Sequence, residues 1–332
     1  MSSRRQGNRE TERSEQRPSN LMEIQNTLRI RAAWLYYVEG HTQGHVADLL
    51  GVSRVTVTRL LSQARQRGEV TIRISAAIAA TVELQRKLER IYDLNEAIVT
   101  PMTDPEADPT RVIAASAGSY VSQMMRDNMT IGVGWGRTLH AALPHIEGRR
   151  LSNVRVISLL GGIAQARRFN PAEFAWQFAE LFDAEGFLIP APALVDSTTT
   201  RHALLEHCGL DQILSMADAS DVALFSAGGI STLTTSYRLG HLSEAERCSV
   251  MEAGAVGDVL YNFIDSNGNV LDHPVNRRIV SIDLDRLRRI PKKVFVSGGA
   301  EKLAAIRATI LALRPTVFIT DEVSARALVE QS

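Results

Sequence analysis

Hydrophobic and polar positions divide the first 75 residues into one polar segment and several short amphipathic segments. Residues 1–20 contain no Val, Ile, Leu, Phe, Tyr or Trp, so we expect a disordered arm there. Apolar residues at helical spacing predict helices within 28–40, 42–51 and 53–68, and each of these segments ends in glycine. Residues 70–75 (VTIRIS) alternate apolar and polar side chains, as a half-buried strand does. The pattern predicts a small helical unit with one strand behind it.

The rest of the chain has a different pattern of apolar and polar residues. Residues 76–92 carry apolar positions suited to a connecting helix, and after them short apolar runs alternate with helical stretches. The candidate strands are 97–100, 130–133, 155–160, 186–190, 221–226, 258–264, 279–282, 293–297 and 316–320. This alternation predicts an α/β domain with a largely parallel sheet. The expected organisation is an arm over 1–20, a helical unit over 21–75, a linker and oligomerisation helix over 76–92, and an α/β domain over 93–332.

Composition and charge narrow the function. The 332 residues include 37 basic and 37 acidic side chains, but residues 1–75 alone have five more basic than acidic ones. This surplus suggests a basic module that binds a polyanion, joined to a larger body that does not. No apolar run approaches the ~20 residues of a membrane helix, and the arginine-rich start lacks the apolar core of an export signal. With only two cysteines, Cys208 and Cys248, we expect a cytoplasmic protein with reduced thiols.

The helices within 42–51 and 53–68, separated by a tight turn at Gly51, form a helix-turn-helix pattern. The small Ala47 allows the two helices to approach, and the second helix presents basic and hydroxyl side chains suited to phosphates and base edges. The strand at 70–75 fits a wing. The residues expected to contact DNA are Gln43, Ser53, Arg54, Thr56, Val57, Arg59 and Arg73. The alternative is a packing or dimerisation unit with a solvated charged face.

Several predicted strands of the α/β domain end in glycine-rich turns. At such turns the backbone N–H groups of a following helix favour an anion, and ligands of open parallel sheets bind outside the carboxyl ends of the strands. No Walker motif and no full dinucleotide fingerprint occurs, so we predict no cofactor, and no histidine or cysteine cluster predicts a metal. The candidate ligand-binding residues are Gly134, Gly136, Arg137, Thr138, Gly161, Gly162, Gly228, Gly229, Asp258, Gly298, Gly299, Lys302 and Asp321. Asp258 and Asp321 have an alternative role as turn or helix caps.

The stretch RIRAAWLYYVEGHTQGHVADLLGVSRVTVTRLLSQARQRGEVTI is similar to the DNA-binding end of the SorC family of sugar-responsive bacterial regulators. The resemblance continues through IGVGWGRTL, ISLLGG, VGDVLYNFIDSNG, VSGGAEKLAAI and FITDEVSARALV, and covers about residues 28–330. It implies a winged helix-turn-helix followed by a Rossmann-like effector domain resembling sugar-phosphate isomerases. It further implies that GWGRTL grips a phosphate, that Asp258 binds hydroxyls and that Lys302 closes the pocket. The family favours tetramers.

A regulator and an enzyme are the two function classes to compare. Isomerisation needs a general base, but the spacing of Asp258, Glu301, Asp321 and Glu322 singles out no base with a partner acid. We therefore expect no catalytic residues, and a repressor-type regulator of a sugar or polyol operon. Its expected partners are operator DNA, a sugar, polyol or sugar-phosphate effector, and further copies of itself in a dimer or tetramer. An isomerase-like enzyme with a DNA-binding module is the alternative, and a docking protein is a weaker third.

Overall fold

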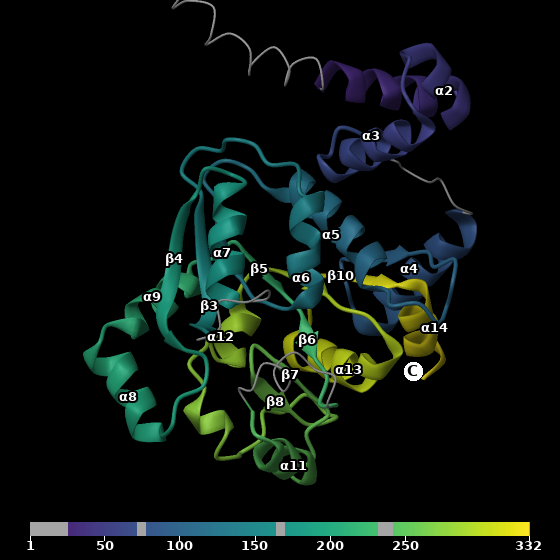
Figure 1. Cartoon of the computed structure of the whole chain (residues 1–332). Helices are drawn as coiled ribbons and strands as arrows, with labels where there is room; N and C mark the ends of the chain where they lie inside the picture. The colour runs from purple at the N-terminus through teal and green to yellow at the C-terminus, as the bar shows by residue number, and fades with distance from the viewer. Residues whose placement is uncertain (1–25, 72–77, 164–169, 232–241, 332) are drawn as a thin grey trace, which may run out of the picture. The chain divides into compact units, whose positions relative to one another are not determined.

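The computed structural model describes residues 26–71, 78–163, 170–231 and 242–331 (Figure 1). The chain divides into two compact units, Met1–Ile74 and Ser75–Ser332. This boundary agrees with the predicted end of the helical unit to within one residue. No helix among the described residues is both long enough and apolar enough to cross a membrane. The predicted arm at 1–20 lies outside the described residues.

The N-terminal unit consists of helices. Residues 26–33 are α-helical and continue into a π-helical turn, η1 (Trp34–Val38), which is followed by α2 (Gln43–Leu50) and α3 (Arg54–Gln66). Thr42 and Ser53 cap the starts of α2 and α3, because each side chain accepts a backbone N–H of the first turn. Gly51 ends α2 in the left-handed conformation, with φ of 65°. The helix-turn-helix is therefore present as predicted.

A small apolar core holds these helices together. Ala32, Val46, Val57, Leu61 and Ala64 are its most deeply buried members, each with no more than 2% of its surface exposed. The predicted strand at 70–75 is a different case. Val70 and Thr71 are not in a strand, and the rest of that segment, including Arg73, lies outside the described residues. The wing thus stays a prediction.

Helix α4 (Ile78–Tyr92) is packed against the larger unit rather than standing apart as a linker. Leu84 and Leu88 are buried in its core, and the Tyr92 hydroxyl donates to the carbonyl of Leu328 at 3.0 Å. The carboxylate of Glu89 accepts the backbone N–H of Ala97 at 3.0 Å. Residues predicted to form a separate connection therefore belong to the α/β unit, and their role in oligomerisation stays a prediction.

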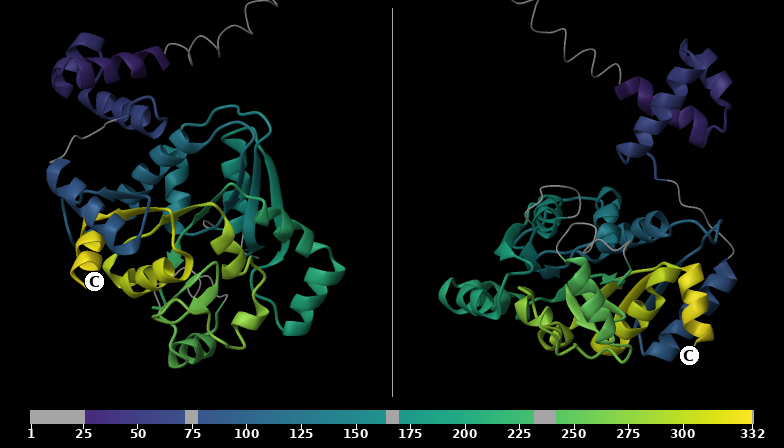
Figure 2. Two further views of the ribbon diagram at one scale, coloured as in Figure 1. Left: turned by 180° about the vertical axis from the view of Figure 1, so that it is seen from behind. Right: turned by 60° about the horizontal axis from the view of Figure 1, so that its bottom comes forward.

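A seven-stranded parallel sheet forms the centre of the larger unit (Figure 2). Its order is β1 (Glu96–Thr100), β10 (Val317–Asp321), β9 (Lys292–Val296), β5 (Val222–Phe225), β2 (Thr130–Val133), β3 (Arg155–Gly162) and β4 (Glu185–Pro192). The strand order reverses between β2 and β5. From β2 the chain continues through β3 to β4 at one edge of the sheet, and from β5 it continues through β9 to β10 towards the other edge. The predicted parallel α/β architecture is confirmed, and the crevice expected at this reversal lies at the carboxyl ends of β2 and β5.

Helices cover both faces of the sheet. On one face α5 (Thr110–Met124), α6 (Arg137–Ala142) and α7 (Pro171–Glu180) pack through residues such as Ile113, Leu139 and Phe178. The other face is covered by α4, α9 (Leu210–Asp218), α12 (Leu284–Arg289), α13 (Leu303–Leu313) and α14 (Glu322–Glu330). The other helical elements among the described residues of this unit are η2 (Leu143–His145), α8 (Thr198–His207), α11 (Glu244–Glu252), η3 (Asn276–Arg278) and η4 (Ala300–Lys302).

A second, antiparallel sheet was not predicted. It contains β6 (Ala227–Gly228), β7 (Gly257–Val259) and β8 (Asn262–Ile264). The single strand expected over 258–264 is therefore a hairpin, because the chain reverses at Leu260 and Tyr261, whose φ angles are 52° and 66°. These left-handed conformations are uncommon for bulky residues, so composition gave no turn signal. The strand expected over 279–282 is also wrong, since Ile279 and Ser281 form only isolated bridges.

Candidate functional site

The start of α3 presents hydroxyl and basic groups to solvent. The Ser53 side chain accepts the backbone N–H of Thr56 at 3.1 Å, and the two hydroxyl oxygens lie 2.9 Å apart. Ser53 and Arg54 are exposed and Thr56 is partly exposed, so these three predicted residues are accessible to a partner. Their neighbourhood has the donors and the positive charge that a phosphate backbone requires.

The prediction for Val57 is wrong. Its side chain is completely buried in the core of the helical unit, where it packs between helices, so it cannot reach a base. The exposed valine of the helix is Val55, with 79% of its surface accessible. The two positions differ by about 200° around a helix, which places them on opposite faces.

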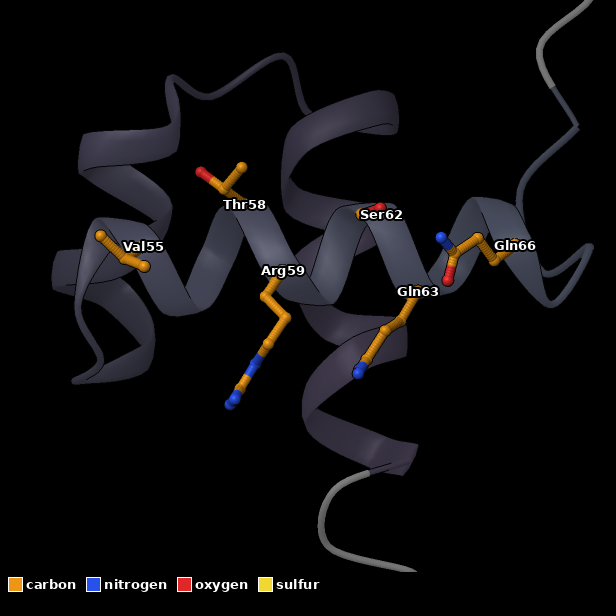
Figure 3. Close-up of a pocket in the computed structure, with 6 residues that line it drawn as sticks. All are labelled: Val55, Thr58, Arg59, Ser62, Gln63 and Gln66. Carbon is orange, nitrogen blue, oxygen red and sulfur yellow. The ribbon is translucent and has the colours of Figure 1, made fainter.

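The outward face of α3 forms a shallow groove (Figure 3). Arg59 and Gln63, one turn apart, project from the same side of the helix in this view. The groove residues are Val55, Thr58, Arg59, Ser62, Gln63 and Gln66. Of these only Arg59 was predicted from the sequence. Helical periodicity counted from Arg59 in steps of three and four residues would have found Val55, Ser62, Gln63 and Gln66, and Thr58 lies three residues after Val55.

Gln43 links the two helices of the helix-turn-helix. It is the first residue of α2, and its carboxamide oxygen accepts the hydroxyl proton of Thr58 at 3.1 Å. This contact leaves the amide nitrogen of Gln43 as the end that can donate to a partner. A second shallow groove adjoins Gln43 and Arg54, and Tyr36, Tyr37 and His41 also line it. The two tyrosines were not among the predicted contacts.

In the α/β unit, the loop after β2 approaches the second sheet closely. A Cβ added at Gly134 would lie 2.9 Å from Cδ2 of Leu260 and 3.3 Å from the carbonyl oxygen of Leu224. Gly136 has φ of 126°, which a side chain would oppose, and it precedes the short helix α6. The two glycines are thus required by close packing and by backbone conformation.

Asp258 lies in β7 with only 3% of its surface exposed. One carboxylate oxygen accepts the backbone N–H of Tyr261 at 2.9 Å. Burial raises the pKa of Asp258 to about 6, although this N–H and the nearby charge of Lys302 oppose the shift. A Cβ at the facing Gly228 would lie 2.2 Å from Oδ1 of Asp258, so only glycine fits there.

Lys302 and Arg137 bring positive charge to the same region. Burial lowers the pKa of Lys302, whereas Glu301, Asp108 and Asp258 favour its charged form. Arg137 lies 3.4 Å from Oδ2 of Asp108. Burial alone would raise the pKa of Asp108, but bonds from Thr110 and the charges of Arg137 and Lys302 hold it below its ordinary value. Lys302 therefore lies near enough to Arg137, Asp108 and Asp258 for their charges to act on its pKa, and Asp108 was not suggested by the sequence.

Asp321 acts as a structural cap. Its Oδ1 accepts the backbone N–H of Ser324 at 2.8 Å, which caps α14, and its Oδ2 accepts the Ser324 hydroxyl at 2.6 Å. The N–H of Gly299 lies 3.2 Å from Oδ2, and a Cβ at Gly298 would lie 2.1 Å from that atom. The capping alternative is the one observed, so Asp321 shapes the loop after β9, and a direct contact with a ligand stays a prediction.

The other residues that were predicted to bind a ligand lie in helices and strands as well as in loops. Thr138 is buried in the first turn of α6, and Gly229 is buried beyond β6. Gly161 and Gly162 are the last residues of β3 rather than a loop. The N–H of Gly161 already donates to the carbonyl of Val280 at 2.9 Å, and the carbonyl of Gly162 accepts from Ala193 at 2.9 Å. These bonds leave less backbone for a ligand than expected.

Two buried hydroxyls lie near the carboxyl ends of β9 and β10. Ser297 and Thr320 are completely buried, and their oxygens have no hydrogen-bond partner among the described residues. Because unpaired buried hydroxyls are costly, these atoms are places where a water molecule or a polar ligand would be stabilising. Within the described ranges, no group of three or more His, Cys, Asp or Glu side chains is arranged to hold a metal ion.

Comparisons with known proteins agree with this two-part organisation. The sugar-binding domain model (Sugar-bind) matches residues 76–330, and a homeodomain-like domain model matches 25–71. The chain is 31% identical over 304 residues to the deoxyribonucleoside regulator of Bacillus subtilis, covering 91% of this chain and 97% of that protein. It is 28% identical to the erythritol catabolism regulatory protein EryD of Brucella abortus, with 94% and 99% covered.

A solved structure shows the same fold over nearly the whole chain. The full-length sorbitol operon regulator SorC from Klebsiella pneumoniae has a TM-score of 0.69 and 24% identity, covering 92% of this chain and 99% of that one. The match of the domain model to most of the chain, together with the close relative in Bacillus subtilis, establishes the relationship. This chain belongs to the SorC family, the bacterial transcription regulators that join a helix-turn-helix unit to a sugar-binding domain.

Proposed function

We propose that this protein regulates a sugar or polyol catabolic operon by binding operator DNA under the control of a small effector. The observation that carries this proposal is the exposed polar face of α3, in a unit with surplus positive charge and a helix-turn-helix geometry. The relatives named as regulators of deoxyribonucleosides and of erythritol catabolism support the same activity.

On DNA, α3 is the recognition helix. Arg59 has the forked donors that pair with guanine, Gln63 can pair with adenine, and Val55 offers an apolar surface to a thymine methyl group. Ser53, Arg54, Thr56 and Gln43 bind phosphates and set the register of the helix in the major groove. This division makes Arg59 a determinant of sequence and Arg54 a determinant of overall affinity.

The effector binds outside the carboxyl ends of β2, β5 and β9. Asp258 accepts hydrogen bonds from hydroxyl groups, while Arg137 and Lys302 neutralise an anionic group, which makes a phosphorylated sugar the preferred ligand class. The charge of Arg137 lowers the pKa of Lys302, and an anion bound between the two side chains would favour the charged form of Lys302.

Two further features belong to this proposal. The protein acts in the cytoplasm as a homo-oligomer, a dimer or tetramer, because two-fold symmetry in a regulator matches a palindromic operator. It is a repressor rather than an enzyme. The low exposure of Asp258 and its pKa near neutrality are also suited to a general base, so turnover of a sugar phosphate is the alternative to test.

The test measures thermal unfolding of the full chain with sugars, polyols and their phosphates, with and without genomic DNA fragments that the protein selects. A ligand at 100 times its Kd is expected to stabilise the fold by about 2.7 kcal/mol. The proposal predicts that one phosphorylated compound stabilises the protein, is recovered unchanged, and alters DNA retention. Conversion of that compound during the incubation, followed by NMR, would instead establish an enzyme.

A further inference from the structure

The first helix of the N-terminal unit carries an apolar stripe that faces away from its own core. Ile30, Trp34 and Val38 are 54%, 57% and 61% exposed. On the opposite side of this helix, Ala32 and Ala33 are buried against α2 and α3. A cluster of exposed large apolar side chains in a small unit marks an interaction surface rather than a packing surface.

The π-helical turn aligns this stripe. In an α-helix each step of four residues advances about 40° beyond one turn, so positions 30, 34 and 38 would drift around the helix. The segment Trp34–Val38 is π-helical, and the N–H of Glu39 donates to the carbonyl of Trp34 at 3.2 Å. A π-helical turn contains more residues than an α-helical turn, so the four residues from Trp34 to Val38 make less than one full turn. Val38 therefore lies in line with Ile30 along the helix axis. The local winding therefore makes a straight stripe centred on Trp34.

Charges flank the stripe on one side. Arg31 and Glu39 are both exposed, each one position after a stripe residue, and the same winding places them on the same flank. Arg31 makes no ion pair with the described residues, whereas Glu39 lies 3.2 Å from Nε2 of His41 through one of its two carboxylate oxygens. Between antiparallel helices, residues of the same flank meet across the contact. In a pair centred on Trp34, Arg31 would then lie within two residues, or about 3 Å along the helix, of the level of Glu39 of a second copy, which is within reach of these long side chains, and this contact would occur twice about the two-fold axis.

We propose that this stripe is the surface through which the helix-turn-helix units of two copies pair, antiparallel about Trp34. Ile30 of one copy packs on Val38 of the other, and the two Trp34 rings lie beside the symmetry axis. Three side chains cover much less than the 1,200 Å² or more of a stable interface, so the contact forms between copies that are already held together. The inference rests on the proposed homo-oligomer and is independent of the proposed DNA and effector contacts.

Cysteine cross-linking of the full chain tests this arrangement. Cys208 and Cys248 are first replaced by Ser, because both are free thiols. In that background, Trp34→Cys is expected to form a disulfide-linked dimer under mild oxidation, while the matched control Leu49→Cys, 50% exposed on α2, does not. An absence of Trp34→Cys cross-links, with or without DNA, or equal linking through Leu49→Cys, would overturn the proposal.

Two further variants define direction and charge. Four residues span about 6 Å along a helix, so in an antiparallel pair the two residues at position 30 lie about 12 Å apart along the helix axis. Two Ile30→Cys chains are therefore too far apart to form a disulfide with each other, but an Ile30→Cys chain should form one with a Val38→Cys chain. If Ile30→Cys alone forms more disulfide-linked dimer than the mixture of Ile30→Cys and Val38→Cys, the helices pair in parallel and the proposal is contradicted. In the Trp34→Cys background, Arg31→Glu or Glu39→Arg should each reduce the cross-linked yield several-fold, and the double exchange should restore it. Failure of the double exchange to restore the yield also counts against the proposal. DNA binding is measured separately, so its loss is distinguished from loss of pairing.

Discussion

Tyr261 stacks on Trp135, with ring centroids 5.1 Å apart and ring planes within 10° of parallel. The stack joins the β7–β8 hairpin, which carries Asp258, to the loop between Gly134 and Gly136. Both rings are buried, and Tyr261 has the left-handed conformation noted above. The hairpin that carries Asp258 and the loop that precedes α6 are therefore joined by an aromatic contact.

Removing this stack should damage the pocket. We expect Trp135→Ala to destabilise the larger unit by about 3–5 kcal/mol, because it leaves a cavity beside Tyr261. The effector-induced rise in Tm should be lost even where the variant remains folded. Trp135→Phe keeps a smaller ring against Tyr261 and should retain most of that rise. Calorimetry with and without the effector measures both, and an unchanged effector shift in folded Trp135→Ala would separate the stack from binding.

Asp258 predicts a pH dependence with a definite sign. Its folded-state pKa is raised from 3.8 to about 6, so the native state binds a proton more tightly than the unfolded state does. Stability associated with this carboxyl is therefore greatest below pH 4 and is lost as the pH rises to about 6. The difference corresponds to about 3 kcal/mol of destabilisation at neutral pH.

The variant Asp258→Asn should remove this dependence. The asparagine retains an oxygen that can accept the N–H of Tyr261, and it is uncharged at all pH values. The variant should therefore be more stable than the parent near pH 7. The fall in the free energy of unfolding that Asp258 causes between pH 4 and 6 should be absent from it. Denaturant unfolding at several pH values, taken as the difference from the parent, isolates this carboxyl from the others. The same slope in both proteins would show that Asp258 is not the group responsible. Effector binding should be lost in this variant.

Arg59 is expected to read sequence, and two replacements separate its contributions. Arg59→Ala should weaken binding to the selected operator by about 1–3 kcal/mol, or about 5- to 150-fold. Arg59→Lys keeps the charge but lacks the forked geometry, so it should preserve the salt dependence while losing discrimination at one base pair. Fluorescence anisotropy with the operator and single-base variants measures both. Equal losses on every sequence would make Arg59 a phosphate contact.

The buried hydroxyl of Thr320 provides a test of packing near the pocket. Thr320→Val removes a hydroxyl that has no partner among the described residues, so stability without effector should be unchanged or should rise by up to about 1 kcal/mol. The matched control is Thr309→Val, since the equally buried Thr309 hydroxyl donates to the carbonyl of Ala305 at 2.7 Å, and its loss should cost about 1 kcal/mol. Comparable losses in both variants would indicate that water or another group pairs with Thr320.

The sequence predicted the features that depend on regular spacing. The helix-turn-helix, the parallel α/β unit and the glycine turn before α6 follow from periodicity and from residues with few conformational alternatives. The errors arise where tertiary contacts override that spacing. The turn at Leu260 and Tyr261 contains neither Gly nor Asn. It is held by Asp258 of the same hairpin and by Trp135, which comes from another part of the fold. Asp108 lies beside Arg137 only because the chain folds its loop there, which no spacing in the sequence indicates.

The assignment of DNA contacts illustrates the same limit on a smaller scale. Val57 lies between the partly exposed Thr56 and the exposed Thr58 in the sequence, but the core of the unit buries it, while Val55 is exposed. A helical wheel distinguishes these positions only when the core-facing direction is known. Leu60, Leu61 and Ala64 define that direction in the structure, and all three are buried.

The most direct test of the account is the affinity of the full chain for its selected operator, measured with and without the phosphorylated sugar that raises its Tm. Linkage between the two sites predicts a change in the Kd for DNA of about 5- to 150-fold, in either direction. Asp258→Asn should bind the operator normally and show no change with the same compound. A compound that binds and stabilises the protein, yet leaves the Kd for DNA unchanged, would contradict the account of an effector-controlled regulator.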